Sequence, residues 1–246
     1  MQKHRYLALV GMRLVQITGK HPYRIHPKHL ISQTPWYLRY IKATDKVLDF
    51  GCGNGQHSLK IAKICKSTTA FDNDRKSLDL AINEARRKGI ENIKFLKHDG
   101  ERKLPFKTNE FDCVLFIDVL EHLKNRNQAL SEIHRVLKNE GNLLITVPNV
   151  DTSWKKLQKK YGLFYYTDPD HKIEFTRKQI ENLLKIKNFT IKKVALGMWD
   201  TPLSGLIDMI GGISLSLYKR LKKIRISYVK KHPIEADGFD IVAVKK

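Results

Sequence analysis

Short apolar runs alternate with amphipathic helical patterns over most of this chain. Seven such runs are predicted to be strands, at residues 46–50, 67–71, 93–97, 111–117, 142–147, 189–194 and 239–244. Between them, apolar residues recur three or four positions apart, as Leu78, Ala81 and Ala85 do ahead of Gly89. The run 111–117 is apolar almost throughout, as in a central parallel strand buried on both faces. The pattern therefore favours an α/β fold.

A glycine-rich loop follows the first predicted strand. Residues 46–50 end in Asp49-Phe50, and Gly51, Gly53 and Gly55 come next, ahead of a helical pattern. Glycines permit positive φ and let a ligand approach the backbone. The dinucleotide-binding spacing is G-x-G-x-x-G, which differs from this loop, and a carboxylate beside the loop would repel a diphosphate but attract a cation. Taken alone, the loop is also compatible with an ordinary strand-to-helix turn.

The loop resembles the first motif of the class I S-adenosylmethionine-dependent methyltransferases. That resemblance implies a Rossmann-like class I methyltransferase fold, with a seven-stranded, mostly parallel sheet and helices on both faces. It also implies that Asp49 faces the methionine end of S-adenosylmethionine, with Gly51 and Gly53 beside it. Motifs at four strand ends, in the expected order between residues 46 and 149, agree with this family.

Two further acidic positions complete the expected cofactor site. Asp72 ends the second predicted strand, about twenty residues beyond the loop, where a carboxylate can accept both ribose hydroxyls. Asp74 is predicted to cap the next helix instead. By resemblance, Asp99 accepts a hydrogen bond from the adenine amino group, although an aspartate in a turn also explains it. Asn73, Gly100 and Asp118 are included in the cofactor site.

The segment 118–123 resembles the fourth motif of the same family. Asp118, Glu121 and His122 match a divalent-ion triplet of some quinone O-methyltransferases, but the same letters occur in members that use no metal, so metal binding stays open. A neutral His122 could instead be the general base. His171, in the loop Asp168-Pro169-Asp170-His171, is the second candidate base, and a role in fixing that loop is the alternative.

Composition narrows the cellular compartment and the kinds of partner that are expected. The three cysteines have no paired spacing, which argues against a disulfide scaffold or zinc cluster and suits a reducing compartment. No apolar stretch reaches transmembrane length, and Arg13 interrupts the N-terminal apolar patch, so a cytoplasmic protein is expected. The net charge of +21 suits polyanions, whether nucleic acid, anionic lipid or an acidic substrate, and equally a solvated basic surface.

The predicted domain organisation is an N-terminal cap at 1–44 and a methyltransferase domain at 45–246. An amphipathic basic insertion at about 199–233 lies outside the family pattern, with an apolar stripe bordered by lysine and arginine. Contact with an anionic membrane, as a peripheral protein at its inner face, is the first interpretation of this insertion. Packing on the core or on a second subunit is the alternative, and the oligomeric state is not fixed by the sequence.

We expect O-methylation of a small, lipid-linked, quinone-like or glycan acceptor by direct methyl displacement. An Asn-Pro-Pro-Tyr tetrad, which grips amino groups in related enzymes, does not follow the fourth predicted strand. An RNA (tRNA) methyltransferase is the second hypothesis, because the charge suits it. A cofactor-binding protein without catalysis is the third.

Overall fold

The computed structural model describes residues 35–246, so the expected cap lies largely outside the described residues. Within them, seven strands form one sheet in the order β3-β2-β1-β4-β5-β7-β6. The strands are β1 Lys46–Phe50, β2 Ser67–Asp72, β3 Ile93–Lys97, β4 Phe111–Ile117, β5 Leu137–Pro148, β6 Phe189–Leu196 and β7 Gly238–Lys245. All seven runs predicted from the apolar pattern are therefore strands.

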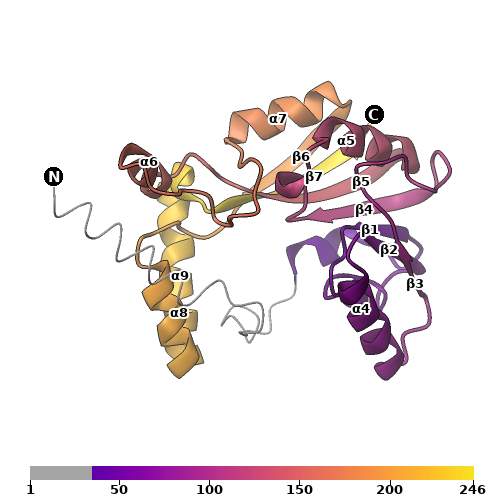
Figure 1. Ribbon diagram of the computed structural model, residues 1–246, viewed down its shortest axis with the longest axis horizontal. Helices are drawn as coiled ribbons and strands as arrows, with labels where there is room; N and C mark the ends of the chain where they lie inside the picture. The colour runs from indigo at the N-terminus through magenta and orange to yellow at the C-terminus, as the bar shows by residue number, and fades with distance from the viewer. Residues whose placement is uncertain (1–34) are drawn as a thin grey trace. The chain divides into compact units, whose positions relative to one another are not determined.

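Helices lie on both faces of this sheet, as expected. Figure 1 shows α4 against one face and α5 and α7 against the other. The helical elements are η1 Trp36–Tyr40, α3 Ser58–Ile61, α4 Arg75–Arg87, η2 Leu120–His122, α5 Arg126–Val136, α6 Ser153–Lys160, α7 Arg177–Ile186, α8 Ser204–Ile213, α9 Leu215–Lys231 and η3 Pro233–Glu235. No helix among the described residues is both long enough and apolar enough to cross a membrane.

Most neighbouring strands run parallel. β1 pairs in parallel with β2 and β4, β2 with β3, and β4 with β5. β6 and β7 run antiparallel, because the amide of Gly197 donates to Gly238 near one end and that of Lys246 to Asn188 at the other. The carboxyl ends of β1, β2 and β4 consequently meet at one sheet edge, where the predicted site residues follow them.

Two local predictions need correction. The strand predicted at 142–147 begins five residues earlier, at Leu137, and Gly141 lies at a bulge within it, since Phe111 pairs with Leu137 and Cys113 with Asn142. Glu140 has φ +60° there. The helix expected after the glycine loop is only four residues long, α3, because its hydrogen bonds mix i→i+3 and i→i+4 spacing on either side.

The chain divides into two compact units. One contains residues 35–148, 170–195 and 240–246, and the other contains 149–169 and 196–239. In the first unit, β4 is the buried centre, with Cys113, Val114, Leu115 and Phe116 fully buried. All of the predicted site residues belong to this unit.

The second unit is held by polar contacts around α6. The Thr152 hydroxyl donates to Asp200 at 2.6 Å, and Ser153 donates to Glu235 through both its amide and its hydroxyl. The ammonium of buried Lys155 donates to the Asn149 carbonyl at 2.7 Å and to Thr167 at 3.0 Å. The insertion expected at about 199–233 forms α8 and α9, which lie side by side in Figure 1.

Candidate functional site

The glycine loop begins at the carboxyl end of β1 and turns sharply next to the end of β2. Gly51, Gly53 and Gly55 have φ values of +72°, +50° and +75°, in the region that favours glycine. The amides of Gly51 and Cys52 both donate to the Phe71 carbonyl at about 3.0 Å, which ties the loop to the end of β2. The backbone of the loop is thereby held in one conformation.

The three glycines differ in what surrounds them. A Cβ on Gly51 would lie 2.8 Å from a Val119 methyl, and one on Gly55 would lie 2.8 Å from the Ala81 Cβ. Protein packing therefore requires glycine at both positions. A Cβ on Gly53 would meet no atom of the described residues within 4 Å. Open space over Gly53 is where a ligand can approach the backbone.

Asp72 lies directly beside this open glycine. One carboxylate oxygen accepts from the Gly53 amide at 2.7 Å, and the other accepts from the Asp74 amide at 2.9 Å. A carboxylate offers about four lone-pair positions, so both oxygens can accept further hydrogen bonds. Asp74 caps α4 as predicted, accepting from the amides of Lys76 and Ser77. Asn73 is exposed between the two aspartates.

Asp49 is buried, 2 % exposed, behind the loop. It accepts a 2.5 Å hydrogen bond from the Ser58 hydroxyl. Burial, with a further contribution from the charge of Asp72, raises the pKa of Asp49 to about 7. A cation placed beside this carboxyl would favour its ionised form, which is the requirement for a partner of an amino group.

Sequence reasoning missed the groups that surround Asp49. Tyr37, on η1, is 2 % exposed, and its hydroxyl lies 2.7 Å from Nδ1 of His57 in the loop. Burial and then the charge of Asp49 hold the pKa of Tyr37 above its ordinary value. The aromatic run at 35–41 was the available signal, but nothing in it indicates contact with a loop twenty residues away.

Asp99 and Gly100 follow β3, and both have partners within the protein. Asp99 accepts from the Glu101 amide at 2.9 Å and lies 3.3 Å from Nε of Arg102. A Cβ on Gly100 would lie 2.5 Å from the Phe50 ring, so packing requires this glycine. The contacts with adenine stay predictions.

The segment after β4 presents a buried acid and an exposed one. Asp118 is exposed with φ +53°, an unusual value for a residue other than glycine, and its amide donates to Thr146. Glu121, on η2, is 1 % exposed. Burial, and then the charges of Asp118 and Glu174, raise the pKa of Glu121 to about 8. Its backbone carbonyl accepts from the Lys172 amide at 2.8 Å.

That backbone contact brings His171 to the same place as His122. The two imidazole rings meet edge to face with centroids 4.7 Å apart. Nδ1 of His171 lies 2.9 Å from Oε1 of the fully buried Glu174, and Nε2 lies 3.9 Å from Oε1 of Glu121. A carboxylate on one ring nitrogen fixes the tautomer and leaves the other nitrogen, here Nε2 on the side of Glu121, able to accept a proton. Glu174 was not predicted, because its role depends entirely on this folded contact.

The same residues include a group that could hold a divalent ion. Ligand atoms of Glu121, His122 and His171 lie within 4.8 Å of one another. Oε2 of Glu121 has no hydrogen-bond partner among residues 35–246. This group differs from the sequence match of Asp118, Glu121 and His122, because His171 takes the place of Asp118. Imidazole with one carboxylate suits a transition metal better than magnesium.

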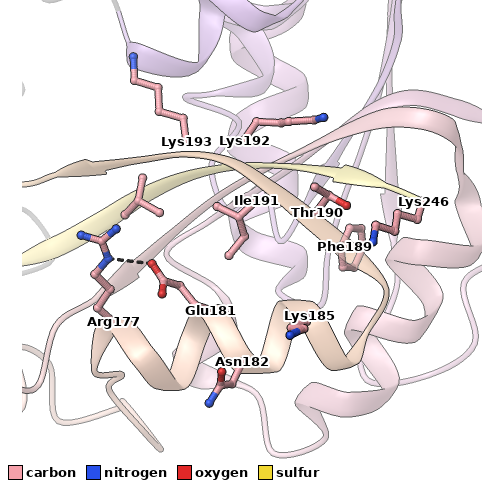
Figure 2. Close-up of a pocket in the computed structure, with 11 residues that line it drawn as sticks. Arg177, Glu181, Asn182, Lys185, Phe189, Thr190, Ile191, Lys192, Lys193 and Lys246 are labelled. Atoms are coloured by element: carbon pink, nitrogen blue, oxygen red, sulfur yellow. Dashed lines mark hydrogen bonds and ion pairs between the residues drawn. The ribbon is translucent and has the colours of Figure 1, made fainter.

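A separate hollow of about 540 Å³ lies between α7 and β6 (Figure 2). Its charged lining is mostly basic and consists of Arg177, Glu181, Lys185, Lys192, Lys193 and Lys246. Arg177 pairs with Glu181 at 2.7 Å. None of the predicted site residues lines this hollow, which is therefore distinct from the glycine loop.

The geometry fits S-adenosylmethionine. The open face of Gly53, the adjoining Asp72 and the buried acid Asp49 lie at the carboxyl edge of a parallel sheet, where α/β folds bind ligands. Fold and loop together define a class I S-adenosylmethionine-dependent methyltransferase domain. The chain belongs to the methyltransferase domain family, whose model matches residues 41–193.

Curated relatives include enzymes of quinone synthesis. The ubiquinone/menaquinone biosynthesis C-methyltransferase of Blochmanniella pennsylvanica is 36 % identical over 127 residues, covering 49 % of this chain and 48 % of the relative. The demethylmenaquinone methyltransferase of Lactobacillus johnsonii is 30 % identical over 147 residues, covering 54 % and 60 %. The chain thus spans about half the length of the curated relatives it matches.

Solved structures agree on the fold. A crystal structure titled as S-adenosylmethionine-dependent methyltransferases, from Methanosarcina mazei, superposes with a TM-score of 0.60 at 22 % identity. That match covers 87 % of this chain and 99 % of the other. At this identity the likeness supports the architecture and leaves the substrate open.

Proposed function

We propose that this chain transfers the methyl group of S-adenosylmethionine to a quinone-like aromatic acceptor that gives up a proton. The observation that carries the proposal is the buried pair of His171 and Glu174, at the sheet edge that also holds the glycine loop. The two curated relatives are methyltransferases of quinone compounds, which supports the choice of acceptor class.

S-Adenosylmethionine, when bound, would supply an electrophilic sulfonium methyl, and transfer of this methyl to the acceptor would release S-adenosylhomocysteine. The chain's own contribution is to bind, orient and accept the proton. Gly53 leaves open space beside the loop, and Asp72, which already accepts from the Gly53 amide, can accept further hydrogen bonds from a ligand there. Asp49 offers a carboxyl that ionises near pH 7.

In the proposed proton step, Nε2 of His171 takes the acceptor's hydroxyl proton, and Glu174 stabilises the resulting imidazolium through Nδ1. His122, whose ring contacts that of His171, is the alternative base. The deprotonated aromatic acceptor carries negative charge on oxygen and on ring carbons. One base therefore serves either O-methylation, the expectation from the sequence, or C-methylation, the activity of the Blochmanniella pennsylvanica relative, in which the proton of the methylated ring carbon then moves to the oxygen.

The test is incubation of the purified chain with methyl-labelled S-adenosylmethionine and short-chain benzoquinol or naphthoquinol acceptors. We expect labelled product and S-adenosylhomocysteine, with methyl NMR of the product distinguishing an O-methyl from a C-methyl group. Cofactor binding without transfer to any quinol would overturn the acceptor assignment. Transfer to tRNA in the same assay would favour the RNA hypothesis instead.

A further inference from the structure

The hairpin of α8 and α9 exposes an unusual amount of apolar surface. On α8 and its approach, Leu203, Leu206, Met209 and Ile213 recur at helical spacing and are 55 %, 43 %, 44 % and 90 % exposed. Leu215 and Leu217 continue this apolar surface around the turn into α9. Single exposed apolar residues need no explanation, but a contiguous group of them marks an interaction surface.

These residues are not needed to hold the hairpin together. A separate cluster does so, in which buried Ile207 and Tyr218 pack with Leu221 between the two helices. The guanidinium of buried Arg225 donates to the Trp199 carbonyl and to the Ser204 hydroxyl, fixing α9 against the start of α8. The exposed leucine, methionine and isoleucine side chains therefore remain available for a partner.

Basic residues border this apolar surface. Lys219, Arg220 and Lys223 on α9 are exposed and lie within two helical turns beyond Leu217. From Leu217 to Lys223 the helix rises about 9 Å, at 1.5 Å per residue. That distance is close to the depth, about 5–10 Å, at which interfacial helices bury their apolar side chains. Asp208 is the only acidic residue between 203 and 231.

We propose that the α8–α9 hairpin docks on an anionic phospholipid bilayer through its turn, with Ile213, Leu215 and Leu217 at the acyl boundary and the α9 lysines and arginine among the headgroups. Among the partners considered, only an anionic bilayer contacts both the apolar surface and the basic residues that border it. Two copies facing each other would bring their basic helices together, which repel. Nucleic acid would use the cations and leave the apolar surface in water.

Flotation of the full chain with vesicles tests the proposal without cofactor or acceptor, so the outcome is independent of methyl transfer. We expect the chain to float with vesicles of phosphatidylcholine mixed with phosphatidylglycerol, and much less with phosphatidylcholine alone. The double variant I213E/L217E should bind the anionic vesicles at least about tenfold more weakly. The matched control is L80E/I186E, which makes the same two kinds of change at residues 62 % and 73 % exposed on α4 and α7, and it should bind normally.

Charge reversal on α9 tests the contribution of its basic residues to vesicle binding. K219E/K223E should lose binding to the anionic vesicles, whereas K76E/K178E, with the same net charge and exposed sites on other helices, should keep most of it. Equal binding of I213E/L217E and the unaltered chain would overturn the proposal. So would a dimer, seen by sedimentation, that dissociates in I213E/L217E, or tRNA binding that depends on Lys219 and Lys223 but not on Ile213.

Discussion

Nδ1 of His171 lies 2.9 Å from Oε1 of Glu174, and both side chains are almost completely buried. A buried carboxylate on one nitrogen holds the ring in the tautomer whose other nitrogen can accept a proton. The pair thus turns a loop histidine into a positioned base. This relationship connects the family assignment to a testable proton step.

Removal of this base should slow turnover and leave cofactor binding intact. We expect His171→Ala to lower kcat by about 10²- to 10⁴-fold, the usual range for a general base, with little change in the Kd of S-adenosylmethionine. Glu174→Gln should lower kcat less and shift its pH profile, because the imidazolium loses its partner. His134→Ala, a change of a half-buried histidine on α5, is the control. Unchanged kcat in His171→Ala would transfer the role to His122.

Asp72 and Asp74 should separate cofactor binding from helix capping. Asp72→Ala removes an acceptor beside Gly53, and we expect S-adenosylmethionine to bind roughly ten- to a hundredfold more weakly by calorimetry. Asp74→Ala removes the cap of α4, which should lower the free energy of unfolding by about 1 kcal/mol and leave the Kd unchanged. Equal losses of affinity in both variants would contradict the role of Asp72.

Gly53 and Gly100 should respond differently to alanine. At Gly100 the new methyl would lie 2.5 Å from the buried Phe50 ring, so we expect a loss of about 1–3 kcal/mol in urea unfolding. At Gly53 space is open and only the positive φ opposes the change, by about 1 kcal/mol. Gly53→Ala should therefore mainly weaken cofactor binding. A Gly53→Ala variant with normal affinity would place the ligand elsewhere on the loop.

Asp49 predicts a pH dependence of both stability and binding. Its pKa in the folded chain is about 7, above the ordinary value of 3.8, so the folded state holds this proton more tightly. Tighter binding of this proton therefore stabilises the folded state fully below about pH 4. This stabilisation is lost as the pH rises to about 7. The difference between the unaltered chain and Asp49→Asn in urea unfolding across that range measures it.

Binding should follow the opposite trend. Ionised Asp49 attracts the cofactor's amino group, so affinity for S-adenosylmethionine should rise with pH up to about 7 and then level off. Asp49→Asn should show neither this rise nor the accompanying proton release in calorimetry. A rise of the same size in both proteins would assign the titration to another group.

Added metal ions test whether Glu121, His122 and His171 form a metal centre or surround a catalytic base. Nε2 of His171 cannot both accept a proton and hold an ion, so added Zn²⁺ should inhibit turnover and a chelator should leave it unchanged. Glu121→Gln should relieve the inhibition. Loss of activity on chelation, restored by a divalent ion, would instead make the group a metal centre.

The sequence by itself determined the sheet and the order of its motifs. A strand that is buried in the sheet needs a run of apolar residues, and such a run is visible in the sequence. All seven strands were therefore predictable. The cap of α4 by Asp74 was predictable as well, and α7 begins with a capping box of Thr176 and Gln179, residue types typical of this position. The glycine loop was identified because positive φ restricts the residue type. The membership of the methyltransferase domain family follows from these local signals.

Only the tertiary structure decided which polar groups meet. Glu174 and Tyr37 gained their importance through contacts with a buried histidine and with the glycine loop, and His171 replaced Asp118 beside Glu121. The fold also separated Gly53, which faces open space, from Gly51 and Gly55, which face Val119 and Ala81. Such pairings depend on how loops from different strand ends converge. The pKa of Asp49 depends on its burial in the folded chain. Neither property can be derived from the spacing of residues along the chain.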